Sequence, residues 1–285
     1  MRFAYPMQKL QDWLTQQWVI LWGRKIKPEE YAWLMGPFGN LDAIGENFIH
    51  ELAEKENLAV DMDAKTTGLI PSINSLNLSE AERSKLSLQV IDFYENTVNY
   101  KLHFSVKWNP FFRVFGVLIN RLFSTRLNQL NIPVKNATTP QELTSELISL
   151  TETGSDQPKY TFWLRSIKSS GQAIYSGAYG IGVLPSGQAC IKAVFPLPNG
   201  NATVLMTPCV GQNGELILES SGKRFGDAGF YFLLKDAKGE YWSQNIQSFR
   251  DRLTIRSEDG CLWAEQVLTL WKKEVLRFQY KIEAK

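Results

Sequence analysis

The spacing of apolar residues changes near residue 155 of this 285-residue chain, and that change constrains the fold more than any other feature. Before it, apolar residues recur mostly at steps of three and four, which is typical of helices. After it, apolar and polar residues alternate, which is typical of strands with one buried face. Residues 153–158 lie between the two patterns and have the composition of a linker.

The second half predicts about ten antiparallel strands joined by short turns. Asn199-Gly200, Asn213-Gly214 and Asp259-Gly260 suit tight hairpins, because Asn, Asp and Gly tolerate positive φ angles. So many strands would leave exposed edges unless the sheet closed. We therefore expect residues 159–285 to form an antiparallel β-meander, as a barrel or strongly curved half-barrel, with a two-sheet sandwich as the alternative. The expected strands cover 160–168, 173–184, 188–195, 202–207, 215–220, 228–235, 240–246, 250–257, 261–270 and 275–282.

The first half, residues 1–152, predicts a mainly helical region with one strand near 99–107. Ser79 and Glu82 form a capping box at one helix start. Leu10, Leu14, Trp18 and Leu21 form one apolar stripe of a helix over 7–24. The other helices are expected over 41–56, 79–97, 111–127 and 139–150. The strand near 99–107 can pair with the meander, so the two regions form either separate parts or one integrated α+β unit.

Composition and charge exclude several classes of protein. The 31 basic and 29 acidic residues give a net charge of +2, which gives no support for nucleic-acid binding. Two His and three widely spaced Cys predict neither a metal site nor disulfides, and no motif predicts a cofactor. No stretch of 18 or more apolar residues is present. We expect a cytoplasmic protein, with membrane association and oligomeric state left open.

A basic stretch nevertheless stands out between residues 96 and 140, which contain six Lys and Arg and no Asp or Glu. On a helical wheel of residues 111–127, the aromatic residues face one way and Arg113 and Arg121 face the other, whereas Arg126 falls on the apolar side. That pattern is typical of a helix on an anionic membrane surface, and equally of a helix packed on a sheet. The residues expected to contact a membrane or a partner are Trp108, Phe111, Phe112, Arg113, Phe115, Arg121 and Phe123.

The N-terminal Trp13, Trp18, Trp22 and Trp33 suggest a second interfacial surface, because Trp is enriched where wet and apolar environments meet. Their alternative role is to cover the open side of the sheet.

A curved antiparallel sheet lined by aromatic and small residues is suited to enclosing an apolar ligand. The Gly-rich segment 177–182 lies between alternating residues, so it indicates a bend or cavity wall in a strand rather than a phosphate loop. The residues expected to line a ligand cavity are Tyr175, Tyr179, Gly180, Gly182, Phe230, Phe232 and Tyr280.

Catalytic motifs are few. His103, on the polar face of the 99–107 strand, is a weak candidate for a general base, with no nucleophile motif near it. The favoured hypothesis is non-enzymatic binding or carriage of an apolar or amphipathic, lipid-like molecule, with peripheral membrane contact. The alternatives are an enzyme acting on a small hydrophobic substrate and an interaction module that uses the Trp-rich N-terminal helix.

Overall fold

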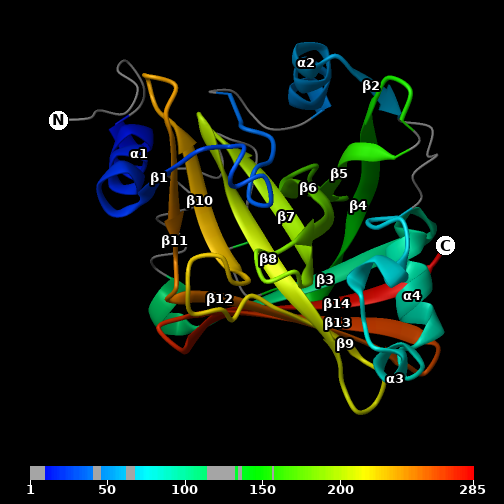
Figure 1. The fold of residues 1–285 in the computed structure, drawn as a ribbon. Coiled ribbons are helices and arrows are strands. Elements are labelled where there is room, and N and C mark those ends of the chain that lie inside the picture. Colours follow the sequence, from blue (N-terminus) through cyan, green and yellow to red (C-terminus); the bar gives the residue numbers. More distant parts are fainter. Residues whose placement is uncertain (1–9, 41–45, 62–67, 114–131, 134–136, 156) are drawn as a thin grey trace.

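The structure, a computed structural model, describes every residue except 1–9, 41–45, 62–67, 114–131, 134–136 and 156. A few N-terminal helices precede a closed antiparallel barrel of ten strands (Figure 1). The expected α+β fold with an antiparallel barrel is therefore confirmed.

Closure of the barrel depends on one long strand, β8. Its first half pairs with β10 (Gly229–Lys235), which lies outside the ring, and its second half pairs with β9. Because β9 also pairs with β12, the ring closes. The barrel strands, in ring order, are β8 (Gly200–Val210), β7 (Ala189–Leu197), β6 (Ala173–Val183), β5 (Pro158–Ile167), β4 (Ala137–Glu152), β3 (Tyr100–Trp108), β14 (Lys273–Ala284), β13 (Cys261–Leu270), β12 (Phe249–Glu258) and β9 (Leu216–Glu219).

The sheet continues beyond the ring as a short extension. β10 pairs with β11 (Tyr241–Asn245), and β11 pairs with β1 (Arg24–Ile26). Ten strands from β5 to β14 match the expected segments closely, but β10 and β11 leave the ring. Their places are taken by β3 and β4, which come from the first half of the chain.

The helix expected over 139–150 is wrong, because this segment belongs to β4. Its leucines fit a helical spacing, but they also fit a strand that is buried on both faces. Leu147 lies in the main barrel core, whereas Ile148 and Leu150 pack outward against α2 (Glu46–Glu56) and its neighbours. β2 (Leu58–Asp61) pairs with the end of β4.

The other N-terminal elements cover the barrel. α2 lies within the helix expected over 41–56 and buries Phe48, Ile49 and Leu52 against the outer face of the sheet. The segment expected as one helix over 79–97 is broken into α3 (Glu80–Arg83) and α4 (Leu88–Glu95), and the capping box of Ser79 and Glu82 is present. Together with the short 3-10 helix η1 (Ile73–Leu76), this segment adds apolar side chains to the barrel core. A second short 3-10 helix, η2 (Thr97–Asn99), leads into β3.

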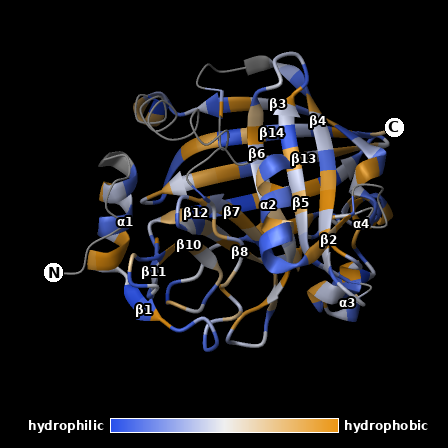
Figure 2. Cartoon of the chain, turned by 90° about the horizontal axis from the view of Figure 1, so that it is seen from above, coloured by the Kyte–Doolittle hydropathy of each residue, from blue (hydrophilic) through white to orange (hydrophobic). Residues whose placement is uncertain are grey.

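Helix α1 (Leu10–Trp22) packs beside the β10–β11 hairpin (Figure 1). It does so through Val19 and Ile20, which lie against Leu234 and Trp242. Along several barrel strands hydrophobic and hydrophilic residues alternate (Figure 2). Successive side chains of a strand point to opposite faces, so each strand has one inward and one outward set.

Candidate functional site

The barrel interior is mainly apolar, but polar side chains from five of its strands meet within it. Rings contact one another across the interior, since Tyr175 of β6 and Phe278 of β14 have centroids 5.9 Å apart and their strands are not neighbours. We call the polar set the interior cluster. Its members are Arg165 (β5), Tyr175 and Tyr179 (β6), Asp251 (β12), Gln266 (β13) and Tyr280 (β14).

Arg165 brings a permanent positive charge into this interior. The side chain is only 8% exposed. Its guanidinium carbon lies 3.7 Å from the ring centroid of Trp163 and 4.7 Å from that of Tyr175, so ring faces stabilise part of the charge. Nη2 donates a 2.6 Å hydrogen bond to the Tyr179 hydroxyl. Nε is buried and has no hydrogen-bond partner among the described residues.

Asp251 adds a buried carboxyl group to the cluster. Its Oδ2 accepts a 2.6 Å hydrogen bond from Gln266 Nε2, while its backbone N–H donates to the Ser220 hydroxyl. Oδ1 is buried and finds no partner in the described part of the chain. Burial raises the pKa of Asp251 to about 7, and the bond from Gln266 opposes this shift. The group therefore exchanges a proton near neutral pH.

The Tyr280 hydroxyl oxygen is the third atom of the cluster that has no hydrogen-bond partner among the described residues. This hydroxyl is buried, and no described residue lies within hydrogen-bonding distance of it. Burial raises the pKa of Tyr280 and of Tyr175, which keeps both phenols neutral. Both groups can thus donate as well as accept a hydrogen bond.

The two ionisable ends of the cluster do not neutralise each other. Within the described residues, no ion pair joins Arg165 to Asp251. A buried polar atom without a partner costs about 1–3 kcal/mol. Three such atoms, on Arg165, Asp251 and Tyr280, belong to this interior among the described residues, which makes it the first candidate site.

The structure brings together three of the residues expected to line a ligand cavity, Tyr175, Tyr179 and Tyr280. Gly180 and Gly182 are elsewhere, because their side of β6 faces outward; a Cβ on Gly182 would meet Cys190 and Lys192.

Phe230 and Phe232 lie outside the ring on β10, where they form an aromatic group with Phe249 of β12. The centroid of the Phe230 ring is 5.1 Å from that of Phe232 and 5.0 Å from that of Phe249. Phe232 also contacts Trp18 of α1. These rings lie near the point where the partner of β8 changes from β10 to β9.

The residues expected to contact a membrane or partner are divided. Trp108 and Phe112 are buried, and Trp108 Nε1 donates to the Pro133 carbonyl at 2.8 Å. They therefore pack inward, in contrast to Phe111, which is 82% exposed, and the exposed Arg113. Phe115, Arg121 and Phe123 lie outside the described residues.

His103 lies on the outer face of β3, away from the interior cluster. Its Nε2 is 3.5 Å from a carboxylate oxygen of Glu283. The geometry therefore gives it a surface partner and no nucleophile. Among the described residues, no three His, Cys, Asp or Glu side chains gather closely enough to hold a metal ion.

Sequence reasoning missed Arg165, Asp251 and Gln266. A signal was present, because Arg165 alternates with the apolar Trp163 and Ile167, and Asp251 alternates with Phe249 and Leu253. A charged residue at an inward position of an alternating strand marks a polar site inside a sheet.

The outer surface of α1 forms a second candidate site. Four large apolar side chains at helical spacing face solvent: Leu14 (54% exposed), Trp18 (38%), Leu21 (70%) and Trp22 (73%). Leu14, Trp18 and Leu21 belong to the stripe that the sequence predicted, but they face outward while the opposite face packs on the hairpin. The side chain of Leu10, the fourth member of that stripe, lies outside the described residues. An exposed apolar stripe on a helix is typical of a surface that contacts a membrane or a partner protein.

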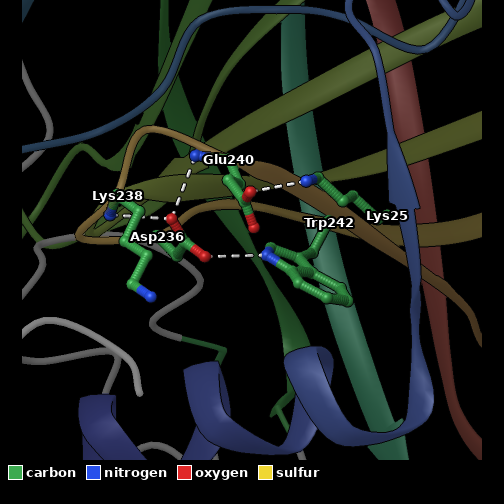
Figure 3. A network of polar contacts seen from close by, with 5 residues as sticks. All are labelled: Lys25, Asp236, Lys238, Glu240 and Trp242. Atoms are coloured by element: carbon green, nitrogen blue, oxygen red, sulfur yellow. Dashed lines mark hydrogen bonds and ion pairs between the residues drawn. The ribbon is translucent and has the colours of Figure 1, made fainter. Parts of the chain in front are cut away.

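A polar network holds the hairpin on which α1 rests (Figure 3). The buried carboxylate of Asp236 accepts hydrogen bonds from the backbone N–H groups of Lys238 and Glu240, each 2.9 Å, and from Trp242 Nε1 at 3.0 Å. Lys25 of β1 forms an ion pair with Glu240. The network fixes the Trp242 ring, which supports the buried face of α1.

Two hollows of about 330 and 300 Å³ lie on the outer surface. The first is beside the β12–β13 turn near Trp263, and the second is between α2 and the β10–β11 turn. Neither includes a residue of the interior cluster.

No family model matches the chain, and no solved structure matches it. The chain is 25% identical over 192 residues to the "Uncharacterized membrane protein YndJ" of Bacillus subtilis (strain 168). The match covers 66% of this chain and 33% of that protein, so the similarity extends to about a third of the longer relative. In the described part of the chain, no helix has both the length and the hydrophobicity needed to cross a bilayer.

Proposed function

We propose that this protein binds an amphipathic small molecule inside its barrel and carries it without chemical change. One observation supports this above all: three buried polar atoms, on Arg165, Asp251 and Tyr280, have no hydrogen-bond partner in the described part of the chain and belong to one mainly apolar interior. An amphipathic molecule suits such an interior, because its polar head completes the hydrogen bonds and its apolar part packs against aromatic rings.

The proposal is tested by native mass spectrometry of the full chain purified from its own host, followed by organic extraction. We expect a stoichiometric small molecule that leaves the protein only on denaturation. A second measurement uses N-phenyl-1-naphthylamine, an uncharged dye that fluoresces in apolar sites; we expect saturable binding with one dye per chain. If no small molecule copurifies with the protein and the dye shows no saturable binding, the proposal is refuted.

Peripheral contact with an anionic membrane is the second part of the proposal. It is supported by the exposed stripe of α1, by the exposed Phe111 and Arg113, and by the name of the similar Bacillus protein, which calls it a membrane protein. Large exposed apolar side chains beside basic residues favour a negatively charged interface.

Vesicle cosedimentation tests the contact. We expect Leu21→Glu to abolish binding to vesicles that contain anionic phosphatidylglycerol. The matched control is Leu88→Glu, which removes an 81% exposed leucine from α4, far from α1. Equal binding by the wild type and Leu21→Glu, or equal loss in both variants, would refute the role of α1.

Catalysis on a small hydrophobic substrate is a second candidate function, which Asp251 favours. A carboxyl group with a pKa of about 7 in an apolar interior has the proton affinity of a general acid or base. The extracted molecule decides between the two functions when it is returned to the protein. A change of its mass with the wild type but not with Asp251→Asn would establish catalysis, whereas an unchanged mass supports carriage.

A further inference from the structure

We infer that the molecule held in the barrel has a head group with a single negative charge, as in the carboxylate of an aliphatic acid, and that Arg165 binds this head group. The inference rests on the proposed function and assigns the chemical class of its ligand.

The first argument is the incomplete set of partners around Arg165. Buried charges in proteins are normally paired, because an isolated charge in an apolar interior is very costly. Among the described residues the partners are three aromatic rings, of Trp163, Tyr175 and Tyr179, and the Tyr179 hydroxyl, and none of them is negatively charged. The planar guanidinium retains a buried Nε–H without a partner among the described residues. Arginine N–H groups are especially suited to carboxylates.

The second argument is that a further donor faces the same interior. The Tyr280 hydroxyl is buried without a hydrogen-bond partner among the described residues, and the positive charge of Arg165 opposes the rise of its pKa that burial causes. The Tyr175 ring, whose centroid lies 4.7 Å from the guanidinium carbon of Arg165, borders the same interior. A carboxylate has two oxygens and can accept from both donors at once. A neutral alcohol head group could not compensate the charge of Arg165.

The third argument is the charge balance of the interior. Asp251 is mostly neutral below pH 7, so that Arg165 contributes one uncompensated positive charge. One negative charge on the ligand balances it, whereas two would leave a net negative charge in an apolar medium. A cationic head group would be repelled. The surrounding rings of Phe104, Phe195 and Phe278 are suited to an alkyl chain.

The test is displacement of N-phenyl-1-naphthylamine from the full chain at pH 6.5 by three molecules with one alkyl chain and different heads: dodecanoate, dodecanol and dodecylammonium. For the wild type we expect dodecanoate to displace the dye at a concentration at least 10-fold lower than dodecanol, and dodecylammonium to be the weakest. Arg165→Met should weaken dodecanoate about 10- to 100-fold, the range for hydrogen bonds to charged groups, and leave dodecanol unchanged.

Two further variants distinguish a loss of ligand binding from a loss of folding. Arg256→Met removes an exposed arginine from the outer face of the barrel and should change nothing. Tyr280→Phe removes only a hydroxyl that has no partner among the described residues, so we expect it to fold and to weaken dodecanoate about 3- to 10-fold with no effect on dodecanol.

The possible failures are distinguishable. If the dye binds and dodecanoate and dodecanol displace it equally, the head-group inference is refuted and the proposed function remains. The inference is also refuted if Arg165→Met weakens all three molecules equally, since this result would assign the residue to the barrel structure. If neither the dye nor any of the three molecules binds, the proposed function fails together with the inference.

Discussion

Replacement of Asp251 by Asn should change how the stability of the protein depends on pH. The substitution keeps the shape of the side chain and leaves an oxygen that can accept the hydrogen bond from Gln266 Nε2. The backbone bonds between Asp251 and Ser220 are unaffected. The variant therefore removes the ionisable proton with little other change.

The sign and size of the effect follow from the pKa. In the unfolded chain the carboxyl group has a pKa of 3.8, and burial raises it to about 7 in the folded protein. Between these values the folded state holds a proton that the unfolded state has lost, so the wild type loses stability as the pH rises, by about 1.4 kcal/mol per pH unit. Over the whole interval the loss in the free energy of unfolding is on the order of 4 kcal/mol. Above pH 7 this group no longer makes the free energy of unfolding depend on pH.

Urea unfolding at several pH values between 4 and 8 measures this difference. Asp251→Asn should match the wild type near pH 4 and become more stable by about 3–4 kcal/mol at pH 7.5. Asp259→Asn, in the exposed β12–β13 turn, removes the same charge from the surface and is the control. If the stability difference between Asp251→Asn and the wild type does not vary with pH, Asp251 is ionised in the folded protein, and burial does not raise its pKa.

Three further predictions concern stability and reactivity. Asp236→Ala should lower the free energy of unfolding in urea by about 2–3 kcal/mol, because the buried Trp242 Nε1 loses its acceptor; an unchanged midpoint would contradict the network. Gly200→Ala should cost about 1–3 kcal/mol in the same assay, because the new Cβ would lie 2.0 Å from the Leu233 carbonyl oxygen; wild-type stability would show that this close approach is absent. In native protein a maleimide should label the exposed Cys209 and spare the buried Cys190, whose pKa burial raises to about 11; mass spectrometry of the labelled peptides checks both.

Much of the barrel was predictable because its signals are local. Asn199, Asp259 and Gly260 all adopt positive φ angles at their turns, as the hairpin pattern requires. The period-two alternation located each strand from β5 to β14 within a few residues. Such signals depend only on neighbours in the sequence.

Partners distant in the sequence were harder to predict. In β4, residues 143, 147 and 150 fit a helix as well as they fit a strand with both faces buried, and only the pairing with β3 and β5 decides for the strand. In α1, the stripe of leucines and tryptophans is the most apolar feature of the helix, yet the opposite face with Val19 and Ile20 meets the hairpin. A helix with two apolar faces does not reveal from its sequence which one packs.

The interior cluster shows the same limit at the level of function. Arg165 and Asp251 are 86 positions apart by their numbers, and alternation could indicate only that each faces inward on its own strand. Closure of the ring, through the split pairing of β8 with β9 and β10, places the two inward faces in one interior. Without closure, each charge would lie on an open sheet and be hydrated. With closure, both lose water while their nearest partners are neutral rings and amides, and this makes the pair a candidate binding site instead of two ordinary surface residues.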